Sequence, residues 1–232
     1  MTLGESAQHI LPSARLLYRR RAEQTMSMPA MRHRWTSDQV RALMDESRPW
    51  PRYELLAGEL LVTPAPGNPH QYAATRLLVA LDPYVMRHDI GAAFTSPADI
   101  ELLRGTITQP DVFVVPLARR EDPDAPRDWS GVTSLLLAVE IISPSSVRAD
   151  RVEKRDHYLR AGVPEYWVVD LDARVVERWS PERETPLVFR TTLEWWPAGA
   201  SEALTIDLVQ LFETIWSTCR RVVPESPSRR VR

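Results

Sequence analysis

Lys154 is the only lysine in this chain of 232 residues, because every other member of its 29 basic residues is an arginine. A compact ammonium group suits a confined pocket that needs a point charge, whereas the planar guanidinium of arginine fits exposed phosphate contacts and ion pairs better. We therefore interpret Lys154 as a candidate catalytic residue. The alternative is a surface lysine that has survived by chance.

Glu140 interrupts an otherwise apolar run over residues 135–142. A run of this kind predicts a strand that is buried on both faces. A carboxylate inside such a strand is costly unless its charge is compensated. A bound cation is the simplest compensation, so Glu140 is a candidate metal ligand.

A second carboxylate, Asp111, stands at the start of the apolar segment 112–115, which predicts a neighbouring strand. Two hard oxygen donors from adjacent strands are what magnesium prefers. Alternation leaves no basic residue on the Glu140 face of its own strand, so the positive charge must come from elsewhere. In a helix after that strand, positions 147, 151, 154, 158 and 161 share a face, and Lys154 can then reach the site with Tyr158 packed beside it.

The remaining patterns predict the elements that position these residues. Thr36 with Gln39 forms a capping-box pattern, Asn68 and Pro69 suit the start of a helix that Pro83 should kink or stop, and Gly162 suits a helix end. The predicted helices span residues 36–47, 69–83, 147–162 and 207–216, and the predicted strands span 53–57, 59–63, 92–95, 99–102, 112–115, 135–142, 165–170, 175–179 and 187–191.

Composition bounds the class of protein. A hydrophobic content of 44% can form one substantial core, and no run approaches the ~18 apolar residues of a membrane helix. The single cysteine, Cys219, excludes an internal disulfide and a thiolate zinc site. Because the sequence also shows no signal pattern, we expect a cytoplasmic protein.

We predict an Arg-rich, disordered extension over 1–34, one folded domain over 35–218, and a disordered tail over 219–232. A net charge of -2 provides no overall attraction to nucleic acid.

Together these residues resemble a known family, the Uma-two-type restriction endonucleases of the PD-(D/E)XK nuclease superfamily. The resemblance extends from about Thr36 to Trp216 and includes the amino-terminal pattern Tyr53-Glu54-Leu55. The other matching segments are Pro110-Asp111, Val139-Glu140-Ile141-Ile142-Ser143-Pro144-Ser145, then Asp150, Lys154 and Tyr158, then Gly162-Val163-Pro164-Glu165-Tyr166-Trp167. The resemblance implies an α/β fold of the restriction-endonuclease-like type, with a mixed central sheet flanked by helices.

The resemblance also implies site residues. Asp111 and Glu140 would be metal ligands, and Glu54 would be a third acidic group and ligand near them. Ile142 occupies the place of the superfamily's usual lysine, which in this family is displaced to the following helix, where Lys154 stands. Glu54 remains open to interpretation as a solvated strand residue.

The activity that the resemblance implies is hydrolysis of DNA phosphodiester bonds by a water activated by Mg²⁺ or Mn²⁺, with Lys154 orienting the nucleophile or stabilising transition-state charge. Two alternatives stay open: a nucleic-acid-binding or assembly module without turnover, and a nuclease for RNA or structured DNA. A homodimer is expected only by analogy with nucleases that cut both strands.

Several other polar residues are weaker candidates. His70 could contact the scissile phosphate or carry a proton, or it could be a solvated or capping residue in the first turn of its helix. We expect His157 at the surface, because it is turned away from Lys154. Glu165 and Asp170 flank an apolar strand and are expected to cap its ends, outside the metal site.

Overall fold

Six strands form the central sheet of the protein, in the order β3-β4-β5-β6-β7-β8. The computed structural model describes residues 33–44, 50–117, 128–143 and 146–222. The predictions of disorder for residues 1–32 and from 223 onward lie outside the described residues. The described residues from Arg34 onward belong to one compact unit.

The sheet is mixed, as predicted. Its strands are β3 (Gly91–Thr95), β4 (Val112–Pro116), β5 (Leu137–Ile141), β6 (Tyr166–Asp170), β7 (Val175–Trp179) and β8 (Leu187–Phe189). Only β5 and β6 are parallel, and the other neighbours are antiparallel. A parallel pair needs a crossover connection, which the π-helical segment η2 (Ala149–Lys154) and α4 (Arg155–Arg160) supply here.

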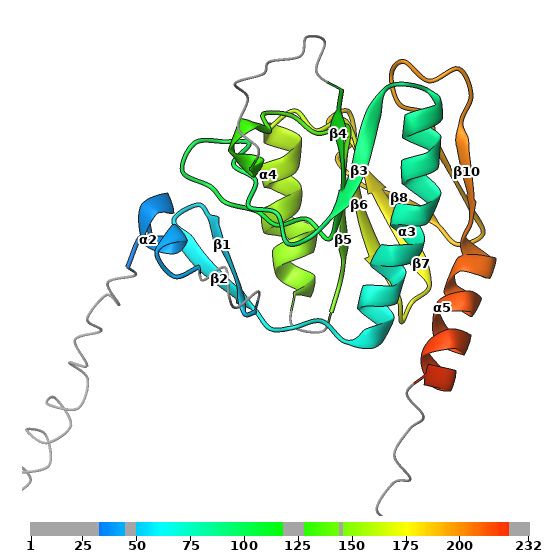
Figure 1. Cartoon of the computed structure of the whole chain (residues 1–232), viewed down its shortest axis with the longest axis horizontal. Coiled ribbons are helices and arrows are strands. Elements are labelled where there is room, and N and C mark those ends of the chain that lie inside the picture. The colour runs from blue at the N-terminus through cyan, green and yellow to red at the C-terminus, as the bar shows by residue number, and fades with distance from the viewer. Residues whose placement is uncertain (1–32, 45–49, 118–127, 144–145, 223–232) are drawn as a thin grey trace, which may run out of the picture. The chain divides into compact units, whose positions relative to one another are not determined.

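Helices cover both faces of the sheet, so the strands between them are buried on both sides (Figure 1). Helices α3 (Asn68–Arg87) and α5 (Leu208–Val222) lie on one face, and α4 lies on the other. Leu137, Val139 and Ile141 of β5 pack in the core beneath α3 and α5, whereas Ala138 packs with Tyr158 of α4. Glu140 alternates with the first three and shares the face of Ala138, so it points toward the α4 side.

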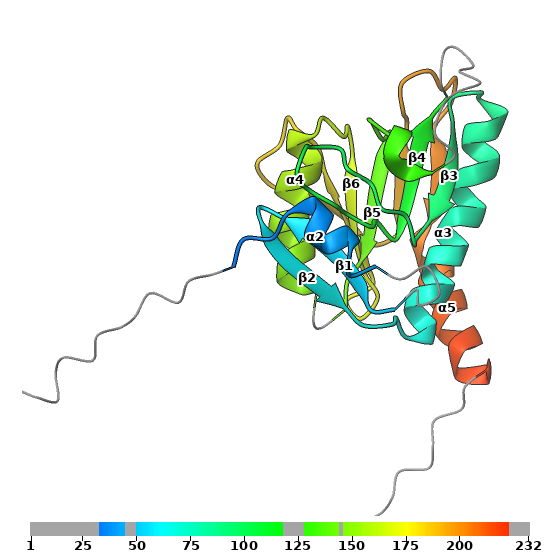
Figure 2. The same cartoon turned by 60° about the vertical axis from the view of Figure 1, so that its left-hand side comes forward.

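Two hairpins complete the fold. The first joins β1 (Arg52–Leu56) to β2 (Glu59–Thr63) through a turn in which Ala57 and Gly58 have φ values of 51° and 82°. Positive φ at both central residues is the requirement of a tight hairpin turn, which explains the glycine. This hairpin lies on the α4 side of the sheet (Figure 2). The second joins β9 (Thr192–Trp195) to β10 (Leu204–Asp207).

Two predicted helix boundaries are wrong. Helix α3 continues through Pro83, because Leu81 before it and Tyr84 and Val85 after it are all buried, and this burial outweighs one lost backbone hydrogen bond. Helix α5 runs past residue 218 because Cys219 continues its buried stripe, so the predicted tail begins inside a helix.

Three further elements differ from the predictions. The helix capped by Thr36 and Gln39 is formed as α2 (Ser37–Arg41), which is shorter than predicted. Residues 99–102 form no strand, because Ile100 makes only an isolated bridge and the Glu101 carboxylate instead accepts the Gly105 N–H at 2.8 Å. The predicted strand 187–191 ends at Phe189, and β9 follows. No helix in the described part of the chain is long and apolar enough to cross a membrane.

Candidate active site

The Lys154 ammonium lies among three buried carboxylates. Its Nζ atom is 3.0 Å from Glu54 Oε2, 3.1 Å from Glu140 Oε1 and 3.4 Å from Asp150 Oδ1. The Asp150 contact is an ion pair only, because Asp150 Oδ1 has no hydrogen-bond partner among the described residues. Lys154 is 6% exposed and the three acids are each 2% exposed, so this is not a surface lysine. The structure therefore brings together Lys154, Glu140 and Glu54, which were predicted from distant segments.

The π-helical form of η2 decides which residues face this cluster. We predicted a regular helix that would place residue 151 on the inner face with Lys154. In the structure η2 is a π-helix up to Lys154, and Asp150 faces inward in place of Arg151. Arg151 turns away to pair with Glu177 at 2.7 Å. A π-helical turn is a common device at functional sites, since it changes the side-chain register within one helix.

Asp111 lies beside this cluster, immediately before β4. Val112 pairs with Val139, so the antiparallel register places Asp111 next to Glu140. Its Oδ2 atom accepts the Ile141 N–H at 2.9 Å and lies 3.0 Å from His70 Nε2. These contacts fix the carboxylate at the end of the buried strand pair and place His70 in the site.

Arg52 of β1 holds the other oxygen of Asp111. Its Nη1 atom donates to Asp111 Oδ1 at 3.0 Å, and its guanidinium stacks over the ring of Trp50 at 4.3 Å. Arg52 was not among the residues predicted from the sequence. In a chain with so many arginines, its only signal was its position two residues before Glu54.

Further hydrogen bonds orient the two glutamates. The Tyr158 hydroxyl donates to Glu140 Oε1 at 3.1 Å, so Tyr158 does pack beside the site as predicted. The Gln109 backbone N–H donates to Glu54 Oε1 at 2.8 Å, while the other Glu54 oxygen faces Lys154. Glu54 is therefore a buried member of the cluster and not a solvated strand residue.

The electrostatics of the cluster show an excess of negative charge. Burial raises the pKa of Glu140 well above its usual value. The charge of Lys154 lowers this pKa, whereas the charges of Asp150, Asp111 and Glu54 raise it further. Burial alone would lower the pKa of Lys154, but the surrounding acids raise it well above its usual value. Burial alone would raise the pKa of Asp111, but His70, Arg52 and Lys154 together lower it below its usual value.

The charge balance leaves room for a cation. The buried carboxylates are Glu54, Asp111, Glu140 and Asp150, and the permanent cations near them are Lys154 and Arg52. If all four carboxylates are ionised, they outnumber these two permanent cations by two. No three His, Cys, Asp or Glu side chains within the described ranges are already grouped around one ion position. The acids are instead paired with Lys154 and Arg52.

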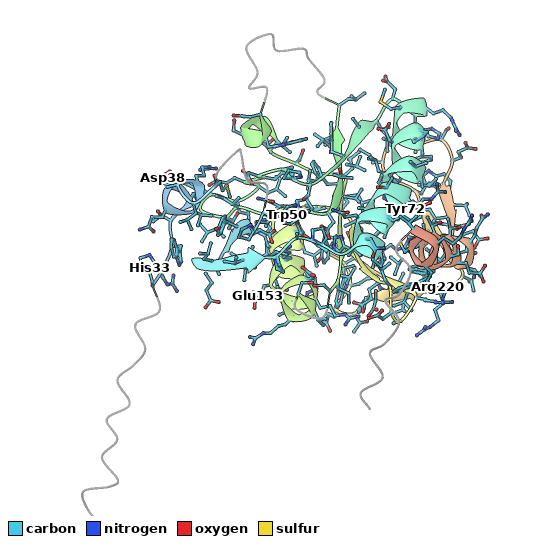
Figure 3. All side chains as sticks on the ribbon, turned by 60° about the horizontal axis from the view of Figure 1, so that its bottom comes forward. His33, Asp38, Trp50, Tyr72, Glu153 and Arg220 are labelled. Atoms are coloured by element: carbon cyan, nitrogen blue, oxygen red, sulfur yellow. The ribbon has the colours of Figure 1, made fainter. Side chains whose placement is uncertain are left out.

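A cavity of about 280 Å³ opens beside these groups. Its polar lining includes Arg52, His70, Asp111, Glu140 and Lys154, and Trp50 forms part of its wall. Figure 3 shows Trp50 near the centre of this side of the molecule, between Tyr72 of α3 and Glu153 of η2. The cluster is thus reached through a pocket rather than from a flat surface.

The remaining candidates lie outside the cluster. His157 is buried at 1% exposure, so the prediction of a surface position is wrong; it packs edge-on to Tyr158. Glu165 accepts the Trp167 Nε1–H at 2.9 Å, and Asp170 accepts the Ala173 N–H at 2.8 Å, so both stand at the ends of β6 as predicted.

Comparisons with known proteins agree with this fold. The model of the Uma2 family, described as "Putative restriction endonuclease", matches residues 37–207. A solved structure from Anabaena variabilis, described as "a putative nuclease belonging to DUF820", is similar with a TM-score of 0.64 and 21% sequence identity. The similarity covers 78% of this chain and 99% of that one. A comparison with curated proteins gives no match.

The family match spans most of the folded domain and includes Glu54, Asp111, Glu140 and Lys154. The central sheet and its flanking helices agree with a nuclease fold. The chain therefore belongs to the Uma2 family of restriction-endonuclease-like proteins.

Proposed function

We propose that this protein is an endonuclease that hydrolyses DNA phosphodiester bonds with the help of Mg²⁺ or Mn²⁺. The observation that carries the proposal is the convergence of one buried ammonium and several buried carboxylates on a cavity, in a chain of the Uma2 family. Strongly perturbed titratable groups that line a pocket are typical of catalytic sites.

The donor chemistry fits a divalent cation. Carboxylate oxygens of Asp111, Glu140 and Glu54 would hold it, and they are the hard ligands that Mg²⁺ and Mn²⁺ prefer. When all four buried acids are ionised, their excess of two over the permanent cations matches the charge of such an ion. A bound ion supplies a water of lowered pKa and neutralises charge on phosphoryl oxygens.

The chain's own residues would divide the remaining work. Lys154 lies within 3.1 Å of Glu140 Oε1, so its ammonium can stabilise negative charge that develops on a phosphate bound next to Glu140. Tyr158 and the Ile141 N–H orient the Glu140 and Asp111 carboxylates through hydrogen bonds. Because the cluster is largely buried, these charges act in a medium where their effect is stronger than in water.

Nicking of supercoiled plasmid DNA tests the proposal. We expect wild-type protein to convert the plasmid to open circles in the presence of Mg²⁺ or Mn²⁺, and not in the presence of EDTA. Glu140→Ala should abolish cleavage. Arg178→Gln is a matched control, because Arg178 contacts Phe189 and the Glu194 carbonyl outside this cavity, and it should cleave like wild type.

Two outcomes would contradict this assignment. Cleavage that persists in Glu140→Ala would place the activity outside this cluster or in a contaminant. A wild-type protein that binds DNA without cutting it would favour the module without turnover. Parallel assays with RNA and with branched DNA decide between the substrate classes.

A further inference from the structure

Arg52 makes an unusual set of contacts for a basic residue in an acidic site. Its side chain is 10% exposed, and it pairs with Asp111 Oδ1 at 3.0 Å. Its Nε atom is buried and has no hydrogen-bond partner among the described residues. Its guanidinium stacks on Trp50 and lines the cavity. The side chain therefore holds one carboxylate while keeping a donor uncommitted.

The Asp111 pairing conflicts with metal ligation. Arg52 occupies Oδ1, and the Ile141 N–H and His70 Nε2 approach Oδ2, so both carboxylate oxygens already have cationic or N–H partners. These three partners take three of the carboxylate's roughly four lone-pair sites, and the site left on Oδ1 lies beside the Arg52 guanidinium, whose positive charge repels a divalent cation. The Ile141 N–H is part of the backbone at the end of β5 and is fixed, whereas the Arg52 side chain is long and can rotate.

We propose that Arg52 is a phosphate-binding residue that is stored on Asp111 and released to the substrate when a divalent cation takes its place. This inference rests on the proposed function. In the stored state the guanidinium supplies part of the charge that the ion later supplies. After release, the same guanidinium lies beside the cavity that the substrate's phosphate would enter.

The chemistry of the side chain suits this exchange. A guanidinium presents a planar fork of donors that matches the oxygens of a phosphate, and charge-assisted pairs of this kind are strong. The stack on Trp50 restrains the plane of the Arg52 guanidinium. The side chain therefore loses fewer conformations when it binds a phosphate. A lysine at position 52 would keep the charge but lose the fork.

A competing interpretation makes Arg52 a structural support that positions Asp111 for the metal. The two interpretations predict opposite signs for the metal affinity of Arg52→Gln. If Arg52 competes with the ion, its removal tightens metal binding. If Arg52 supports the ligand, its removal weakens metal binding.

Isothermal titration calorimetry with Mn²⁺ alone, on the full-length protein, measures that sign. We expect Arg52→Gln to bind Mn²⁺ about 5-fold or more tightly than wild type, which is within the ordinary range of coupling between two sites. A second titration, with inorganic phosphate at saturating Mn²⁺, should show phosphate binding weakened about 5-fold or more in Arg52→Gln. Arg178→Gln should change neither affinity.

The two affinities together decide whether the exchange occurs. Tighter Mn²⁺ with weaker phosphate supports the exchange. Weaker or unchanged Mn²⁺ binding, or unchanged phosphate binding, overturns it. Circular dichroism establishes that each variant is folded, and Arg52→Lys, which keeps the charge, should show the loss of phosphate affinity without a large gain for Mn²⁺. Since neither titration contains nucleic acid, a protein that cleaves nothing still tests Arg52, and an active nuclease whose Arg52→Gln behaves like wild type refutes only this inference.

Discussion

Replacing Lys154 with methionine tests whether its ammonium neutralises the buried acids. Methionine keeps an unbranched side chain of similar length but carries no charge. The variant leaves Glu54, Glu140 and Asp150 facing one another, although each is only 2% exposed. Removing one partner of a buried ion pair costs about 3–5 kcal/mol, so we expect a loss of about 4 kcal/mol in the free energy of unfolding at pH 8.

The loss should depend on pH, and its sign follows from the acids. Without Lys154 the pKa values of Glu140 and Asp150, which are already raised by burial, rise further in the folded state. A raised folded pKa gives stability at pH values below the unfolded pKa, and that stability is lost as the pH rises through the folded pKa. Because the pKa of Lys154 is raised, its ammonium stays charged in the folded and unfolded wild-type protein below pH 10, so its titration does not change the stability over this range. The cost of Lys154→Met should therefore be smaller at pH 5 than at pH 8.

Urea unfolding followed by tryptophan fluorescence at pH 5 and pH 8 measures both values. Arg155→Met is a matched control on the next residue, because Arg155 pairs with an exposed Asp156 and stacks on Trp179. Its loss should cost less than about 1 kcal/mol at either pH. A Lys154→Met cost below about 1 kcal/mol at pH 8, or an equal cost at both pH values, would refute the reasoning.

Three further predictions concern single side chains around the cluster. Lys154→Arg should keep the fold but lower the cleavage rate by about 100-fold or more, because a planar guanidinium is too broad for a position between Glu54 and Glu140. Cleavage by this variant at the wild-type rate would remove the catalytic role of Lys154. Burial, with the charges of Arg160 and Lys154, lowers the pKa of His157 to about 4 from 6.5, so the fold should lose up to about 3 kcal/mol as the pH falls from 6.5 to 4. Urea unfolding of His157→Phe over that range should show a smaller loss, and a loss equal to that of wild type would assign the acid sensitivity elsewhere. Tyr158→Phe removes the hydrogen bond to Glu140 and should lower the free energy of unfolding by about 1–2 kcal/mol. Its cleavage rate should stay within about 10-fold of wild type. Complete inactivation would make Tyr158 part of the catalytic machinery.

The sequence carried enough information to predict the fold and to identify Lys154 and three of the four acids that come together: Glu54, Asp111 and Glu140. A carboxylate in a buried strand demands a partner, and a lone lysine among arginines suggests a position that does not tolerate guanidinium. Glu140 and Lys154, which were identified on those two grounds, lie 3.1 Å apart.

Other features required the tertiary structure. The register of a π-helical turn is not visible in hydrophobic periodicity, so the inward position of Asp150 was missed although the residue belongs to the family pattern. Arg52 was missed because its role depends on pairing across 59 residues with Asp111. His157 was misplaced because a residue three positions after Lys154 lies on the same face of a regular helix, and that face is buried. Pro83 was interpreted from its local preference, whereas packing of α3 against the sheet decides its conformation.

X-ray diffraction from crystals soaked with Mn²⁺ tests the central claim most directly. We predict an anomalous peak about 2.0–2.3 Å from carboxylate oxygens of both Asp111 and Glu140, next to the Lys154 ammonium. The same map would show whether Glu54 is a ligand. A fully occupied Mn²⁺ position elsewhere, with Asp111 still paired to Arg52 and Glu140 still paired to Lys154, would contradict the account.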